Sequence, residues 1–103
     1  MDVYRLNEQG EPVPCDITEW GAWFEKADRV VKVTHFKDTR VSTVFLGFDH
    51  SFQSNENPVL WETMVFGGSQ DQDICKRCTG SYQNALAMHD KVLEQLGLKE
   101  LEE

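Results

Sequence analysis

Two β-rich runs in the middle of the chain, residues 41–49 and 59–66, constrain the fold more than any other feature. Each run is rich in valine, threonine and aromatic residues, as strands usually are. The polar segment between them, residues 51–58, predicts a hairpin with a long connecting loop. In a sheet with one face in water, apolar and polar residues alternate along each strand more regularly than they do in these runs. We therefore expect that other elements cover both faces of the hairpin, or that one face is an interface. The two apolar faces are Val41, Thr43 and Phe45 on one side and Val44, Leu46 and Phe48 on the other.

Shorter patterns place the other elements. Residues 3–6 and 30–36 are predicted strands, and residues 17–27 are a predicted helix capped by Asp16 or Thr18. A last helix starts at a Thr79 or Ser81 cap and ends at Gly97. Its predicted inward stripe comprises Tyr82, Leu86, His89, Val92, Leu93 and Leu96.

These elements predict one α+β domain over residues 1–97, followed by an acidic tail at 98–103. We expect an antiparallel sheet of four to five strands with a central hairpin, packed by two helices. The chain has 103 residues, of which 40% are hydrophobic, enough for one modest core.

The charge of the chain excludes one class of function. With 10 Lys+Arg against 18 Asp+Glu, the net charge is -8. A protein that binds nucleic acid by neutralising phosphates needs the opposite balance, so no direct nucleic-acid binding is expected. The net charge is compatible with a basic protein partner, or with a small anionic ligand bound in a locally positive pocket.

The location predicted from the sequence is the cytosol of a bacterial host. The first residues lack the basic and apolar regions of a signal peptide, and no apolar run approaches the roughly 20 residues that span a membrane. Three cysteines, an odd number, do not suit a secreted disulfide framework. We therefore expect a cytoplasmic protein with no membrane association.

The Cys75-x-x-Cys78 motif has three readings. Two thiolates at this spacing can hold one side of a zinc ion, with Cys15, His50 or His89 completing the site. The pair could also be a redox motif, although it lacks a parallel βαβ setting. Without a second such pair, two incidental thiols are the favoured reading, and metal binding stays open.

Asp49, His50 and Glu62 form a second candidate cluster, near the loop of the hairpin. If His50 lies opposite Val59, then Gly47 lies opposite Glu62, and Asp49 and Glu62 share a face; a slip of one residue pairs Glu62 with His50 instead. Carboxylates placed together could bind a divalent cation or do acid–base chemistry. The alternative is that Asp49 and His50 begin the loop, while Glu62 pairs with Arg40 or Lys32 across strands.

The remaining candidates are a histidine, an aromatic ring and a small anion-binding edge that Arg40, Ser42 and Thr43 could make with Arg5. His89 is expected to be a buried, hydrogen-bonded core residue rather than a catalyst. Trp61 could stack on a ring, although core packing is the default. No catalytic residue and no cofactor is predicted. The predicted ligand-binding residues are Arg40, Thr43, Asp49, His50, Trp61 and Glu62.

Four segments, residues 13–16, 19–29, 41–50 and 61–68, resemble in order a family of small uncharacterised bacteriophage and prophage proteins. The resemblance covers roughly residues 3–95 and includes the final helix with a histidine like His89. It implies phage origin rather than a particular activity. The sequence departs from the family around Cys75–Cys78, where a Tyr-Ser-Thr-like stretch usually precedes the helix.

Small acidic phage proteins are often accessory proteins, so we expect a non-enzymatic binding protein. It would be a homo-oligomer that antagonises a host defence system by sequestering a host protein or a small nucleotide-like, anionic ligand. One alternative is a metal-dependent hydrolase that uses Asp49, His50 and Glu62. Another is a structural or regulatory component of the virion.

Overall fold

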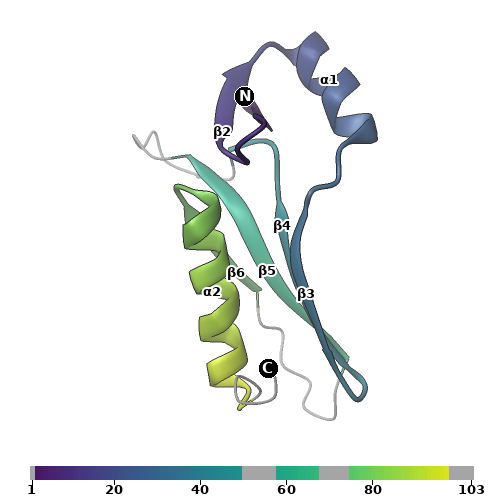
Figure 1. Cartoon of the computed structure of the whole chain (residues 1–103), viewed down its shortest axis with the longest axis vertical. Helices are drawn as coiled ribbons and strands as arrows, with labels where there is room; N and C mark the ends of the chain where they lie inside the picture. Colours follow the sequence, from purple (N-terminus) through teal and green to yellow (C-terminus); the bar gives the residue numbers. More distant parts are fainter. Residues whose placement is uncertain (1, 50–57, 68–74, 98–103) are drawn as a thin grey trace.

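The computed structural model describes residues 2–49, 58–67 and 75–97, and of residues 75 and 76 only the backbone. Two antiparallel sheets and two helices make up this part of the chain (Figure 1), so the predicted α+β class is confirmed. One sheet has two strands, β1-β2, and the other has four, in the order β3-β4-β5-β6. The elements are β1 (Val3–Leu6), β2 (Pro12–Cys15), α1 (Ile17–Lys26), β3 (Val30–Phe36), β4 (Thr39–Phe45), β5 (Val59–Gly67), β6 (Cys75–Thr79) and α2 (Tyr82–Gln95).

Two strands, β2 and β6, are absent from the sequence prediction. β2 contains two prolines, which lack the N–H that a central strand needs and are tolerated at a sheet edge. β6 reads Cys-Lys-Arg-Cys-Thr, a polar segment without the β-branched alternation of a predicted strand. Both elements pair with a stronger neighbour, β1 and β5 respectively, so tertiary pairing rather than local sequence defines them.

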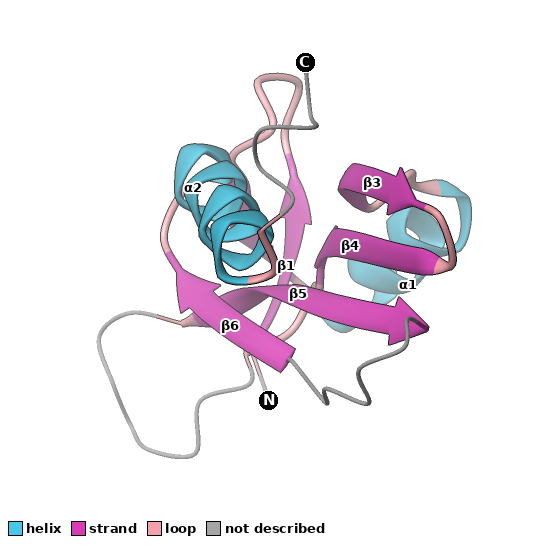
Figure 2. Ribbon diagram, turned by 90° about the horizontal axis from the view of Figure 1, so that it is seen from below, coloured by secondary structure: helices cyan, strands magenta, loops and turns pink. Residues whose placement is uncertain are grey.

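Helix α2 lies along one face of the four-stranded sheet and makes contact with all four strands (Figure 2). Its N-cap is Ser81, whose hydroxyl accepts a hydrogen bond from the Asn84 N–H. The chain turns away at Gly97, which has a φ of 74°. The predicted inward stripe is close to the observed one, except that Ala85 belongs to it; the buried residues are Ala85, His89, Val92 and Leu93.

Helix α1 and the small sheet β1-β2 lie together at the end of the larger sheet opposite the β3–β4 turn (Figure 1). Asp16 is the N-cap of α1, because its carboxylate accepts the Glu19 N–H at 2.7 Å. Trp23 connects this part to the main core by packing edge-on against Phe45, with ring centroids 5.9 Å apart.

The predicted strand over residues 41–49 is wrong in its second half, because β4 ends at Phe45. Gly47 follows with a φ of 85°, a conformation that breaks a strand. From there the chain leaves β5 and pairs with β1 instead, as the Tyr4 N–H donates to the Gly47 carbonyl at 2.8 Å. Phe48 therefore does not lie on a hairpin face with Val44, whereas the Leu46 N–H still donates to the Leu60 carbonyl of β5 at 2.6 Å.

The sequence leaves the hairpin register open, and the structure has neither of the two registers considered. Glu62 lies opposite Val44, and not opposite Gly47 or His50. Phe45 lies opposite Trp61, and their rings pack with centroids 4.9 Å apart. Burial of this aromatic pair under α2 favours the observed register, since a slip of one strand by one residue would turn one of the two rings to the other face of the sheet.

The face of the four-stranded sheet turned away from α2 is named here the open face. Residues directly opposite in the register share a face, and Val41, Thr43 and Phe45 are buried under α2, so the alternate residues belong to the open face. Three of the four exposed large hydrophobic residues in the described part of the chain lie there: Val30, Val33 and Phe66 are 49%, 38% and 39% exposed. The half-buried Val44 and Met64 complete the apolar set.

Candidate functional site

Two of the predicted ligand-binding residues, Thr43 and Trp61, lie in the core. Both are fully buried. The Thr43 hydroxyl is hydrogen-bonded to His89 and to Thr63, and the indole N–H of Trp61 donates to the Gly80 carbonyl at 2.7 Å. Neither side chain is accessible to a ligand in this structure.

Arg40 and Glu62 share the open face but lie in different cross-strand rows. Arg40 lies opposite Phe66, and its guanidinium carbon is 4.3 Å from the centre of that ring. Glu62 lies opposite Arg77 on β6 and accepts from the Arg77 Nε at 2.8 Å. The expected cross-strand partner of Glu62 was Arg40 or Lys32, so the ion pair exists with a different residue.

Asp49 has a structural role at the start of β5. Its carboxylate oxygen accepts the Val59 N–H at 2.9 Å, which orders the chain where the strand begins. His50 lies outside the described residues. Within residues 2–49, 58–67 and 75–97, no group of three or more His, Cys, Asp or Glu residues is placed to hold a metal ion. Ligand binding by Arg40, Asp49, His50 and Glu62 stays a prediction.

The Cys75-x-x-Cys78 motif lies on β6 and not at the start of a helix. Residues three apart on a strand have Cα atoms about 10 Å apart, whereas a disulfide needs less than about 7 Å. Burial raises the pKa of the Cys78 thiol, and burial together with Glu19 raises that of Cys15. Both thiols are therefore protonated near neutral pH and are weak nucleophiles.

His89 is a buried, hydrogen-bonded core histidine, as predicted. Its Nε2 lies 2.9 Å from the Thr34 hydroxyl, and its Nδ1 lies 2.7 Å from that of Thr43. Thr43 continues the chain of hydrogen bonds to Thr63, so α2 is tied to β3, β4 and β5. Burial is the main cause that lowers the pKa of His89, so the ring is neutral at pH 7.

The charges are unevenly distributed over the fold. We name the part made of β1, β2 and α1, residues 2–28, the acidic lobe. It carries seven acidic and two basic residues, Arg5 and Lys26. Arg5 pairs with Glu19 at 3.2 Å. All seven acidic residues are exposed, namely Asp2, Glu8, Glu11, Asp16, Glu19, Glu25 and Asp28.

A hollow of about 490 Å³ opens on the acidic lobe, between the two short strands and the start of α1. The charged residues that line it are Asp2 and Asp16. Tyr4 also lines the hollow, as does Ile17, an apolar residue that is 66% exposed. Such a hollow suits the aliphatic stem and positive head of a lysine or arginine side chain.

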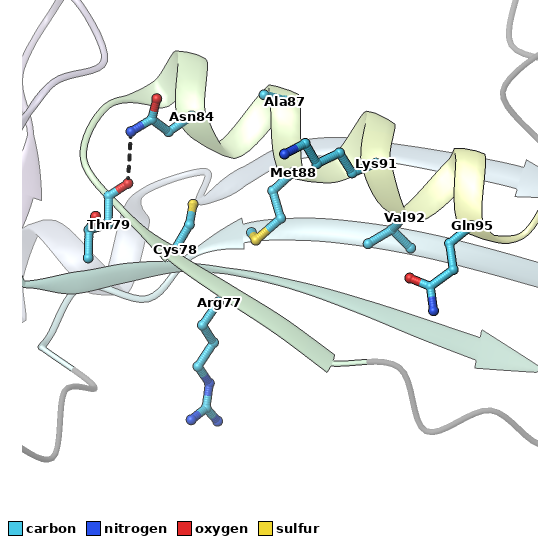
Figure 3. Close-up of a pocket in the computed structure, with 9 residues that line it drawn as sticks. All are labelled: Arg77, Cys78, Thr79, Asn84, Ala87, Met88, Lys91, Val92 and Gln95. Carbon is cyan, nitrogen blue, oxygen red and sulfur yellow. Dashed lines mark hydrogen bonds between the residues drawn. The ribbon is translucent and has the colours of Figure 1, made fainter.

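A groove of about 550 Å³ lies on the other side of the fold, between α2 and β6 (Figure 3). Cys78, Met88 and Val92 point into it, while Arg77 points away from the helix. The Asn84 side chain closes one end by donating to the Thr79 carbonyl at 3.1 Å. Sequence reasoning missed this groove because it depends on β6.

No protein-family model, curated protein sequence or solved structure matches this chain. Among the helices that the structure describes, none is long and apolar enough to cross a membrane. The site assignments therefore rest on the geometry and charge of the chain itself.

Proposed function

We propose that this chain is a non-enzymatic binding protein that captures a basic protein through its acidic lobe. The observation that carries the proposal is the concentration of seven exposed acidic residues, against two basic ones, within residues 2–28: two lie on α1 and five in the segments that flank β1, β2 and α1. Such a surface attracts a basic partner over about a Debye length and speeds its association. The hollow beside Asp2 and Asp16 would bind one basic side chain of the partner.

The reactive side chains favour binding over catalysis. Both ring nitrogens of His89 are within hydrogen-bond distance of threonine hydroxyls, and the ring is fully buried. The raised pKa values of Cys15 and Cys78 disfavour thiolate formation at neutral pH. Asp49 and Glu62, the carboxylates of the hydrolase alternative, are engaged with Val59 and Arg77.

The proposed assembly is a homodimer formed through the open face. Three exposed hydrophobic residues on one face of a small sheet favour association. The register places Arg40 with Phe66, Ser42 with Met64, and Val44 with Glu62. If a two-fold axis crosses the strands at the row of Ser42 and Met64, the Arg40 end of one copy lies over the Glu62 end of the other.

The biological role proposed for capture is antagonism of a host defence system in the bacterial cytosol. This step rests on the resemblance to phage and prophage proteins, and on the charge of the acidic lobe as the means of sequestration. A sequestering protein needs no turnover, only affinity and sufficient copies.

The test is capture from a lysate of the bacterial host by the wild type and by two charge-reversed variants. Glu8→Lys/Glu25→Lys alters two exposed positions of the acidic lobe, and Asp38→Lys/Glu94→Lys makes the same change in net charge elsewhere. We expect the wild type and the second variant to retain the same basic protein, and the first variant to lose it. Because the attraction between the charges is screened by salt, added salt should release the captured protein.

Equal capture by both double variants would show that the acidic lobe is not the binding surface. The biological arm is phage plating on a host that carries the affected defence system. Expression of the wild type should raise plating efficiency, and expression of Glu8→Lys/Glu25→Lys should not. If neither protein changes plating on any defended host, the anti-defence role is wrong.

A further inference from the structure

The groove between α2 and β6 combines the outer edge of a strand with a helix wall. β6 is the last strand of the order β3-β4-β5-β6, and within the part of the chain that the structure describes no strand pairs with its outer edge. A strand edge of this kind presents backbone N–H and C=O groups that an extended peptide can pair with. The helix wall supplies side-chain contacts for the residues of such a peptide that face α2.

The groove has room for an extended segment. Its helical wall runs from Asn84 to Gln95, a length of about 16 Å at about 1.5 Å per residue. An extended chain advances about 3.3 Å per residue, so about five residues span the groove. Met88 and Val92 point from the helix toward the strand, and Cys78 points back toward the helix (Figure 3). These side chains make an apolar floor.

The charge of the groove is opposite to that of the protein. The charged residues that line it are Arg77 and Lys91, both basic, in a chain with a net charge of -8. Arg77 already binds Glu62, whereas Lys91 is exposed on the helix wall. A local positive charge in an acidic protein selects for a carboxylate.

A second copy of the chain is a poor occupant. β6 carries Lys76 and Arg77 next to each other, so edge-to-edge pairing of two β6 strands would bring four basic residues together. Basic residues on an edge strand are a recognised means of preventing that pairing.

We propose that the groove between β6 and α2 binds an extended acidic peptide, which adds to the sheet as a strand beside β6. Apolar side chains of the peptide face Met88 and Val92, and a carboxylate lies near Lys91. This inference rests on the proposed function in that the chain binds protein, and it names a second contact, of opposite charge. The acidic lobe and the groove are on different elements, so each can be tested with the other intact.

The experiment selects peptides of about ten residues from a random yeast-displayed library on the full-length protein. Enriched peptides should lack proline, alternate apolar residues with others, and carry Asp or Glu. Their affinity, measured by fluorescence anisotropy, should fall about tenfold or more in Lys91→Glu, which reverses the wall charge, and in Ala87→Tyr, which fills the groove. Lys26→Glu and Gln83→Tyr are the matched controls, exposed positions outside the groove, and should bind normally.

Backbone pairing is tested with N-methylated peptides. A strand donates alternate N–H groups to its neighbour, so methylation of one alternate set should abolish binding and methylation of the other should not. Binding that survives both sets, or that is equal in Lys91→Glu, Ala87→Tyr and wild type, would overturn the proposal. Failure to enrich any peptide would also overturn the proposal. If the enriched peptide dissociates a dimer of the wild-type protein, the groove binds a second copy of the chain, and the proposal is wrong. Unchanged capture by the acidic lobe in Lys91→Glu keeps the two functions distinguishable.

Discussion

His89 and Thr43 join the helix to the middle of the sheet, with His89 Nδ1 2.7 Å from the Thr43 hydroxyl oxygen. Both residues are fully buried. Thr34 on β3 binds the other ring nitrogen, and Thr63 on β5 binds Thr43. A buried polar chain of this kind stabilises one packing of α2 over others, because any shift of the helix leaves polar atoms without partners.

The first prediction is that acid destabilises the protein through His89. Burial, reinforced by Lys32 and opposed by Asp90, lowers the pKa of the folded-state ring. An unfolded histidine titrates near about 6.5, so below that pH the unfolded chain binds a proton that the folded chain does not. The stabilisation is therefore complete above about pH 6.5 and is lost as the pH falls toward the folded-state pKa, at up to about 1.4 kcal/mol per pH unit. Urea unfolding between about pH 7.5 and about pH 5 measures this slope.

His89→Leu is the second prediction and supplies the control for the first. The variant leaves the hydroxyl of Thr34 without its ring partner, so we expect a loss of about 1–3 kcal/mol in the free energy of unfolding at pH 7. The slope assigned to His89 should vanish at the same time. A variant that keeps the full slope would show that another group causes it.

The third prediction concerns Gly47, where the chain leaves the hairpin. A Cβ added there would lie 3.0 Å from Trp20 Nε1 and 3.1 Å from Phe24 Cε2, at a φ of 85°. We expect Gly47→Ala to destabilise the fold by about 1–3 kcal/mol. Gly21→Ala is the matched control, because Gly21 lies in α1 with nothing within 4 Å of an added Cβ, and it should stabilise by about 0.5–1 kcal/mol. Thermal unfolding followed by circular dichroism separates the two, and equal melting temperatures would contradict the account.

The fourth prediction concerns the thiols. Iodoacetamide should modify Cys15 and Cys78 more slowly in the folded protein than in urea, because folding raises both pKa values. Glu19→Gln removes a negative charge near Cys15 and releases Arg5, so alkylation of Cys15 should accelerate while that of Cys78 stays unchanged. Peptide mass spectrometry reports each rate, and equal acceleration at both cysteines would exclude the electrostatic cause.

The fifth prediction tests the open face by sedimentation. Phe66→Lys places a charge at an exposed position of that face, so it should dissociate the dimer while the fold is retained. Ile17→Lys makes the same kind of change at an exposed position of α1 and should leave the dimer intact. A wild-type protein that sediments as a monomer at high concentration would refute the proposed assembly.

The sequence predicts the fold class because β3, β5 and α2 carry strong local patterns, and each forms close to its expected bounds. It does not predict the hairpin register, since apolar residues on both sides of the runs allow several pairings until the Phe45–Trp61 contact under α2 selects one. The end of β4 depends on pairing with β1, more than 30 residues away along the chain, which no local pattern reports.

The candidate sites were predicted less completely for the same reason. Glu62 pairs with Arg77 of β6, and the local sequence of β6 does not predict a strand. The groove between α2 and β6 could not be predicted either, because β6 forms one of its walls. The acidic lobe is different, because its charges are visible in residues 2–28. Only the fold, however, shows that all seven acidic side chains are exposed.

Native mass spectrometry of protein purified gently from its bacterial host is the sharpest test of capture through the acidic lobe. We expect a dimer of this chain that carries a bound basic protein, and Glu8→Lys/Glu25→Lys should give the same dimer without that protein. A bare wild-type chain, or an identical complex from the charge-reversed variant, would contradict capture through the acidic lobe.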